Sequence, residues 1–276
     1  MINLERPILI GGPCAAESAE QVNKTAFDAR VRGFGIFRAS LEKPRTSPWE
    51  IVNGERRPCF LGVGVETGAP WLVEASKRNN IVPATEVMSG GQLLTYLEVA
   101  SGAGLKNVCA WLGSRRITDQ NFLQEIGGIA RENPTLILGL KNPTAKDERT
   151  WLGVIGWTIH GGADPRQMFT VHRGFPDDSQ NLFRNPPDWD MMIRVAEKSG
   201  LPMIVDPSHI GGGRQKVIEV VNSVIDTQVP LDGFMVEIHP NPRIALTDAN
   251  QQLSWQDYDS TLKEKIDQWQ RTYRQK

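Results

Sequence analysis

The chain has 276 residues, and its 31 Lys and Arg side chains almost balance 32 Asp and Glu side chains. This balance argues against a nucleic-acid partner and against attachment to an acidic membrane surface. No apolar run approaches the roughly 20 residues of a membrane span, and the three cysteines show no paired spacing. We therefore expect a cytoplasmic protein with reduced thiols.

Short apolar runs recur along the chain, and each ends at charged or metal-binding side chains. In chain order these are Cys14, Arg38, Glu86, Arg115, Lys141, His172 with Arg173, Asp206 with His209, and Glu237 with His239. Segments with helical periodicity follow the runs, at about 17–32, 67–79, 89–101, 119–132, 147–161, 188–199, 213–226 and 255–273. Strands that alternate with helices are parallel. Eight such units predict an α/β protein, a single-domain (β/α)₈ barrel over residues 1–276.

Two helices have clear apolar stripes. In the first, Val22, Ala26, Phe27 and Val31 are expected to face the core, and the last, 255–273, begins at a Ser254 cap. The connections 39–65 and 173–187 are unusually long. In a (β/α)₈ barrel the active site lies at the C-terminal ends of the strands, where such loops and the residues that end the strands converge.

Residue types that commonly bind metal ions occur together at one part of the barrel rim, which is formed by the C-terminal ends of the strands. Cys14, His209 and Glu237 follow the first, seventh and eighth strands, which are neighbours in a closed barrel, and Asp248 follows later. A thiolate, an imidazole and two carboxylates favour Mn²⁺, Fe²⁺, Co²⁺ or Zn²⁺ over Mg²⁺ or Ca²⁺. Taken alone, Cys14 could instead be a small buried hydrophobe. Cys109 is interpreted as a core residue, and Cys59 is left unassigned.

Cations form a second group at the same rim. They are Arg38, Lys43, Arg115, Lys141 and Arg173. A ring of cations repels itself, so it predicts a substrate that carries phosphate and carboxylate groups. The alternative is a network in which these cations pair with Glu86, Asp206 or other carboxylates.

Nine motifs occur in order over nearly the whole chain: GGPCAAES (11–18), FRASLEKPRTSP (37–48), ATEV (84–87), GSR (113–115), LKNP (140–143), VHRGF (171–175), RNPPDW (184–189), DPSHIGG (206–212), and VEIH (236–239) followed by LTDANQQ (247–253). Together they resemble the type I 3-deoxy-D-arabino-heptulosonate 7-phosphate (DAHP) synthases. The similarity is greatest to the short β-subgroup, especially forms fused to chorismate mutase.

The resemblance implies condensation of phosphoenolpyruvate with erythrose 4-phosphate to DAHP and phosphate, the first step of the shikimate pathway. One divalent metal ion would be held by Cys14, His209, Glu237 and Asp248. Phosphoenolpyruvate would contact Arg38, Lys43, Ser114, Arg115, Lys141 and Arg173, and Arg45 with Thr46 would bind the phosphate of erythrose 4-phosphate. The catalytic residues would be His209, Lys43, which protonates the forming alkoxide with a pKa lowered by neighbouring cations, and Glu86, which positions water.

Three other functions are weighed against this one. A 3-deoxy-D-manno-octulosonate 8-phosphate synthase would use arabinose 5-phosphate, but KPRTSP favours the four-carbon aldose. A metal-dependent amidohydrolase would show His-x-His after the first strand, where this chain has GGPC. A non-catalytic barrel serving as an interaction module would be expected to lack a ligand or an anion contact.

The partners expected beyond the substrates are further copies of this chain in a homo-oligomer. No separate regulatory domain is expected within residues 1–276. Phenylalanine, tyrosine and tryptophan should therefore leave the rate nearly unchanged. A separately encoded chorismate mutase could still dock and regulate the barrel.

Overall fold

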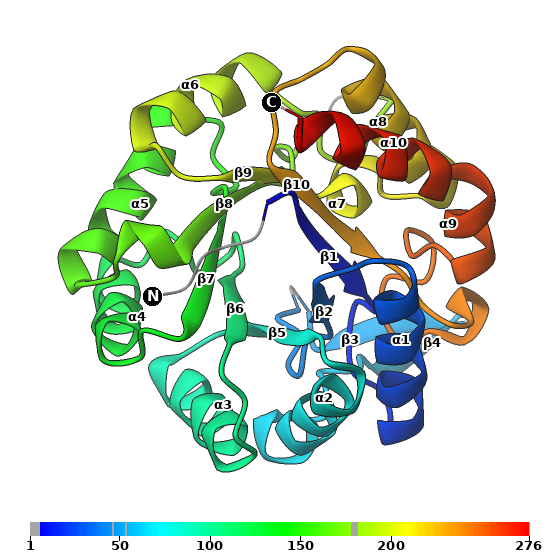
Figure 1. Cartoon of the computed structure of the whole chain (residues 1–276). Coiled ribbons are helices and arrows are strands. Elements are labelled where there is room, and N and C mark those ends of the chain that lie inside the picture. Colours follow the sequence, from blue (N-terminus) through cyan, green and yellow to red (C-terminus); the bar gives the residue numbers. More distant parts are fainter. Residues whose placement is uncertain (1–5, 46, 53, 178–181, 276) are drawn as a thin grey trace.

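The computed structural model describes residues 6–45, 47–52, 54–177 and 182–275. Eight parallel strands close into a barrel in the order β1-β10-β9-β8-β7-β6-β5-β2. Their bounds are β1 (Ile8–Gly12), β2 (Ile36–Arg38), β5 (Val82–Val87), β6 (Val108–Leu112), β7 (Leu136–Lys141), β8 (Met168–His172), β9 (Met203–Val205) and β10 (Gly233–Glu237). Figure 1 looks into this barrel, with the helices arranged around the strands. The predicted (β/α)₈ fold is confirmed.

The helices occupy the predicted segments with small shifts at their ends. Their bounds are α1 (Ala19–Val31), α2 (Val65–Asn79), α3 (Gly90–Gly102), α4 (Gln120–Glu132), α5 (Glu148–Gly161), α6 (Trp189–Ser199), α7 (Pro207–Gly211), α8 (Arg214–Asp226), α9 (Trp255–Thr261) and α10 (Lys263–Tyr273). Side-chain oxygens of Ser18, Ser89, Asp119, Asp147 and Asp188 accept N–H groups of the first turns, which explains where these helices begin.

Three details differ from the sequence-based expectations. The segment 255–273 is divided into two helices at Leu262, whose φ of −119° departs from the usual helical value of about −63°. The short helix α7 was not predicted. In α1, Val22 and Ala26 are buried as expected, but Phe27 and Val31 are 57% and 58% exposed and face away from the core.

Apolar side chains form two clusters, one inside the barrel and one between the strands and the surrounding helices. Ile10, Trp111, Phe169, Met235 and other strand residues fill the interior, and a larger cluster packs the outer faces of the strands against the helices. Cys109 belongs to the interior cluster and is fully buried, so its predicted core role is confirmed. The strands are thereby held rigidly, and so are the side chains at their ends.

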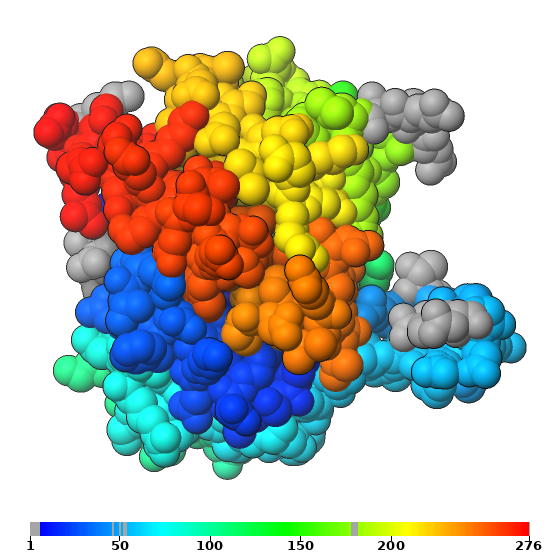
Figure 2. Space-filling view, turned by 90° about the vertical axis from the view of Figure 1, so that its right-hand side faces the viewer, coloured from blue at the N-terminus to red at the C-terminus, as the bar shows by residue number. Residues whose placement is uncertain are grey.

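The connection after β2 contains a hairpin that the sequence did not predict. Strands β3 (Trp49–Val52) and β4 (Glu55–Pro58) pair antiparallel outside the barrel. In Figure 2 this light-blue segment projects to the right of the main body. Its residues are mostly exposed, and Arg56 stacks on Trp49 at 4.7 Å from the ring centroid. Among the described helices, none is long and apolar enough to cross a membrane.

His172 ends β8 but packs outside the barrel interior. Its ring is fully buried against Trp151 at 5.5 Å and Trp189 at 5.4 Å, and its Nε2 accepts the Asp188 N–H at 3.2 Å. Burial lowers the pKa of His172 to about 3, although Asp188 acts in the opposite direction. In an unfolded chain a histidine pKa is about 6.5. The unfolded chain therefore takes up a proton that the folded chain excludes.

This difference makes stability fall as the pH falls from about 6.5 towards 3. In the His172→Gln variant, the loss of unfolding free energy between pH 7 and pH 5 should be smaller by about 2 kcal/mol than in the parent chain. Urea unfolding at the two pH values measures it. The exposed His160 serves as control, since His160→Gln should keep the parental pH dependence. Equal pH dependence of His172→Gln and the parent chain would contradict the prediction.

Candidate active site

Three predicted metal-ligand residues meet where the first and last strands pair. Cys14 follows β1, Glu237 ends β10, and Gly12 is aligned with Glu237 in the parallel ladder. Asp248 comes from the loop after β10, and its Oδ2 accepts a hydrogen bond from Cys14 Sγ at 3.1 Å. Cys14, Glu237 and Asp248 form the candidate metal-ligand group, in which one ligand atom of each residue lies within 4.8 Å of the others. The closure of the barrel therefore assembles this group.

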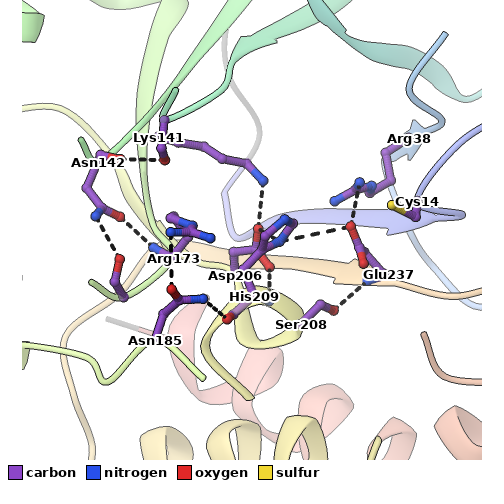
Figure 3. A network of polar contacts seen from close by, with 12 residues as sticks. Cys14, Arg38, Lys141, Asn142, Arg173, Asn185, Asp206, Ser208, His209 and Glu237 are labelled. Atoms are coloured by element: carbon purple, nitrogen blue, oxygen red, sulfur yellow. Dashed lines mark hydrogen bonds and ion pairs between the residues drawn. The ribbon is translucent and has the colours of Figure 1, made fainter. Parts of the chain in front are cut away.

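The fourth predicted ligand, His209, lies beside the group rather than within it. It is on α7, where the Asp206 side chain accepts the His209 backbone N–H at 3.0 Å. The imidazole Nδ1 lies 2.8 Å from Asp206 Oδ2 and 3.9 Å from Glu237 Oε1. Figure 3 shows these three side chains side by side. A ligand role for His209 stays a prediction.

Amide and hydroxyl groups hold the metal-ligand residues in place. Gln252 Oε1 accepts the Cys14 backbone N–H at 2.9 Å, and Gln251 Nε2 donates to Glu237 Oε2 at 2.5 Å. Ser208 Oγ accepts the Glu237 N–H at 2.9 Å. The sequence analysis assigned none of these three roles, although both glutamines lie in the LTDANQQ motif. Adjacency to Asp248 in that motif was the available signal.

The protonation of this group follows from its burial and charges. Burial raises the pKa of the Cys14 thiol to about 12, and the Glu237 carboxylate adds to the rise. Burial acts to raise the pKa of Asp248 as well, but Lys43 and the thiol hydrogen bond outweigh it and lower that pKa to about 2. A divalent cation would take the place of the thiol proton, because metal ligation requires the thiolate. One sulfur and two carboxylates form a donor set that suits a transition ion.

Two of the five predicted cations pair with buried carboxylates. Arg38 Nη2 donates to Glu237 Oε1 at 2.9 Å, and Lys141 Nζ donates to Asp206 Oδ2 at 2.8 Å (Figure 3). The alternative of a salt-bridge network therefore holds for these two side chains. Arg38 Nε and Nη1 are nevertheless buried without a hydrogen-bond partner, so Arg38 keeps donors for an anion.

Lys43 contacts the metal-ligand group instead of the other cations. Its Nζ donates to Cys14 Sγ at 3.0 Å. Desolvation acts to lower the pKa of Lys43, but attraction to Cys14, Glu86 and Glu237 outweighs it and raises the pKa above the usual value. The expectation that neighbouring cations lower this pKa was wrong, because anions surround the ammonium group. Lys43 is therefore a protonated donor at neutral pH.

The remaining predicted residues line a cavity of about 390 Å³ at the C-terminal ends of the strands. Its walls include Lys43, Arg45, Glu86, Ser114, Arg115, Lys141, Arg173, His209 and Asp248. Ser114 Oγ donates to the Asn142 carbonyl at 2.6 Å, and Arg115 donates to the Pro44 carbonyl. Thr46, the other predicted residue of this loop, lies outside the described residues. The structure therefore brings predicted cations and metal-ligand residues to one cavity.

The surroundings of Arg173 and Glu86 include Arg184, Asn142 and Gly113, to which the sequence analysis gave no role. Burial lowers the pKa of Arg173 to about 10, with Arg184 and Arg115 adding to the effect and Asp206 opposing it. The Arg173 N–H donates to Asn142 Oδ1 at 2.7 Å. Gly113 makes room for Glu86, because a Cβ there would lie 1.9 Å from Glu86 Oε1.

Two asparagines fix the loops that carry these residues. Asn142 Nδ2 donates to the Gly174 carbonyl at 2.9 Å, and Asn185 Nδ2 donates to the His209 carbonyl at 2.5 Å (Figure 3). Asn185 Oδ1 also accepts from Arg173 Nη1 at 3.4 Å. Both asparagines lie in motifs noted in the sequence, LKNP and RNPPDW, but their hydrogen-bond partners can be identified only from the three-dimensional structure.

Comparison with known proteins identifies the family. The model of the DAHP synthetase I family matches residues 3–273. The chain belongs to the DAHP synthetase I family. It is 28% identical over 256 residues to the phospho-2-dehydro-3-deoxyheptonate aldolase of Thermotoga maritima, covering 93% of this chain and 68% of that protein. The predicted family and enzyme class are thus confirmed.

Solved structures and a second group of relatives extend this result. The crystal structure of the Thermotoga maritima DAHP synthase superposes with a TM-score of 0.79 at 26% identity, covering 94% of this chain and 68% of that one. A 2-dehydro-3-deoxyphosphooctonate aldolase of Azoarcus sp. is 25% identical over 270 residues, covering 90% of this chain and 85% of its own length. This member of the DAHP synthetase I family is thus similar in sequence to two kinds of aldolase.

Proposed function

We propose that this chain is a 3-deoxy-7-phosphoheptulonate synthase, which condenses phosphoenolpyruvate with erythrose 4-phosphate to give DAHP and phosphate. The observation that carries the proposal is the meeting of Cys14, Glu237 and Asp248 with a cation-lined cavity on one barrel rim. Membership of the DAHP synthetase I family supports it. The reaction needs a site for two phosphorylated substrates, and the cations that line the cavity would provide it.

Different residues of the chain would bind phosphoenolpyruvate, deliver a proton and position water. Arg38, Lys141, Arg173, Arg115 and the Ser114 region would bind the phosphate and carboxylate of phosphoenolpyruvate. Lys43, protonated and next to Cys14, would deliver a proton to the oxygen that becomes an alkoxide when carbon 3 of phosphoenolpyruvate attacks the aldehyde. Glu86 would position the water that adds at carbon 2 before phosphate leaves.

A divalent ion, Mn²⁺, Fe²⁺, Co²⁺ or Zn²⁺, would be held by Cys14, Glu237, Asp248 and His209. When bound, such an ion supplies Lewis-acid polarisation of the aldehyde carbonyl. His209 would also belong to the catalytic residues, because it lines the cavity as well as adjoining the ligand group.

One assay tests the proposal and its alternatives. The purified chain is incubated with phosphoenolpyruvate and either erythrose 4-phosphate or arabinose 5-phosphate, with Mn²⁺ or with chelator, while the enol absorbance is followed. Consumption with erythrose 4-phosphate and Mn²⁺, lost in chelator, is expected. Consumption only with arabinose 5-phosphate would favour the octulosonate reaction, and no consumption with either aldose would favour a non-catalytic barrel.

Arg45 is expected to select the aldose. It follows Pro44, lines the cavity, and is positioned by a hydrogen bond from its Nε to the Phe60 carbonyl at 3.3 Å. Arg45→Ala removes a charge-assisted contact to phosphate worth about 1.5–3 kcal/mol, or roughly 10 to 150-fold in affinity. The KM for erythrose 4-phosphate should rise by this factor, while the dissociation constant of phosphoenolpyruvate stays nearly unchanged.

Steady-state kinetics and calorimetric titration with phosphoenolpyruvate measure the two quantities. Arg57→Ala is a matched control, because Arg57 is exposed on β4 and pairs with Glu55. Loss of phosphoenolpyruvate binding in Arg45→Ala, with an unchanged aldose KM, would overturn the assignment.

We also propose that the chain is cytoplasmic and forms a homo-oligomer. All three cysteines are free, which suits the reducing cytoplasm. Homo-oligomer formation and docking of a separately encoded chorismate mutase stay predictions from the family resemblance. Light scattering of the purified chain, alone and mixed with a chorismate mutase, would measure both.

A further inference from the structure

We propose that Glu17 is a positioning residue, which sets the distance between Cys14 and Asp248 and thereby the affinity for the metal ion. This inference rests on the proposed function, because it concerns the same metal-ligand group. Glu17 belongs to the segment after β1 that carries Cys14. Its carboxylate reaches the loop after β10 that carries Asp248.

Each oxygen of Glu17 contacts a different part of the second loop. Oε1 accepts the backbone N–H of Leu246 at 2.8 Å, two residues before Asp248. Oε2 lies 3.4 Å from Nε2 of His239, two residues after Glu237. The His239 ring is oriented by its other nitrogen, since Nδ1 accepts the Asn241 N–H at 3.0 Å. That bond places the proton of a neutral imidazole on Nε2. Nε2 is buried and has no hydrogen-bond partner among the described residues, so its approach to Glu17 Oε2 at 3.4 Å is an electrostatic contact.

The side chains in this contact are enclosed by the protein. The Glu17 side chain is 12% exposed and the His239 side chain is 3% exposed. The Glu17 N–H donates to Gln21 Oε1 at 3.2 Å, and Gln21 Nε2 donates to the Ala15 carbonyl at 3.1 Å. Helix α1 therefore fixes the Glu17 backbone before the carboxylate contacts the other loop.

The Asp248 loop needs such anchors. Asp248 has a φ of 45°, in the left-handed region that non-glycine residues rarely adopt. A residue in this conformation persists only where its surroundings hold it. Gln252 provides a second anchor, with its Oε1 on the Cys14 N–H and its Nε2 on the Thr247 carbonyl at 2.8 Å. Glu17 and Gln252 together tie the Cys14 segment to the Asp248 loop.

The experiment measures metal binding directly. Purified metal-free chains are titrated with Co²⁺, and the thiolate-to-cobalt absorbance reports binding at Cys14. Glu17→Ala should weaken Co²⁺ binding about 10 to 100-fold, the effect typical of residues that orient metal ligands. Glu17→Gln keeps an acceptor for the Leu246 N–H but loses the negative charge near His239. Its Co²⁺ affinity should therefore lie between that of the parent chain and that of Glu17→Ala. Glu20→Gln, the same change on the exposed face of α1, should bind Co²⁺ as the parent chain does.

A double-mutant cycle with Asp248→Ala separates positioning from general destabilisation. If Glu17 acts through Asp248, Glu17→Ala should weaken Co²⁺ binding little further once Asp248 is absent. Unchanged Co²⁺ affinity in Glu17→Ala, or additive effects in the double variant, would overturn the proposal. An inactive parent chain that binds Co²⁺ with these dependences would contradict the proposed reaction but leave the role of Glu17 intact.

Discussion

Cys14→Ser is expected to weaken binding of a divalent transition ion by more than about 100-fold, with a matching loss of turnover at low metal concentration. Changes to residues that merely orient a metal ligand cost 10 to 100-fold, and this change removes the sulfur ligand itself. Cys14 Sγ is within 4.8 Å of ligand atoms of Glu237 and Asp248, and neither Cys59 nor Cys109 belongs to this group. The serine hydroxyl is a poor substitute for a thiolate.

Cobalt titration and turnover at fixed free Mn²⁺ measure the two effects. Cys59→Ser is the matched control, because Cys59 is a free cysteine outside the metal-ligand group. The control should retain parental metal affinity and turnover. Parental activity of Cys14→Ser in chelator would contradict the metal assignment.

Lys43→Met should lower kcat by roughly 10² to 10⁴-fold at saturating metal, the usual contribution of a positioned proton donor. Methionine keeps much of the side-chain volume but removes the ammonium group that lies 3.0 Å from Cys14 Sγ. That ammonium lowers the pKa of Cys14, which burial raises, so metal affinity should fall as well. Turnover at saturating metal therefore separates loss of the proton donor from loss of metal.

Lys106→Met is the matched control, since Lys106 is exposed and precedes β6 at the opposite end of the barrel. It should keep the parental kcat. A Lys43→Met variant with parental kcat at saturating metal would show that the proton comes from another group.

The barrel was predictable because its strands and helices carry strong local signals. Apolar runs such as VCAWL and LILGL are long enough to mark buried parallel strands, and their ends mark the rim. The hairpin β3–β4 was missed because ERRP is charged and exposed, so it lacks the apolar alternation of a strand. Helix α7, with five residues, is too short to show periodicity.

The composition of the site was predictable, but its pairing was not. Residue types at strand ends point to metal and anion chemistry, and Cys14, Glu237 and Asp248 do lie together. The partners of each side chain depend on distances across the barrel. Arg38 pairs with the Glu237 carboxylate, and Glu86 and Glu237 attract the Lys43 ammonium group, so carboxylates offset cations that were expected to repel one another. The predicted direction of the Lys43 pKa shift was therefore wrong.

The register between β1 and β10 has a consequence for how the enzyme is made. Cys14 and Asp248 are 234 positions apart, and they meet only when the first strand pairs with the last. During synthesis, the metal-ligand group cannot form until Asp248 has been translated. The proposed metal ion would therefore stabilise only the completed barrel, because an ion that binds the native state shifts the folding equilibrium towards it. Products of translation that stops before Asp248 would lack this stabilisation, because they cannot form the metal-ligand group.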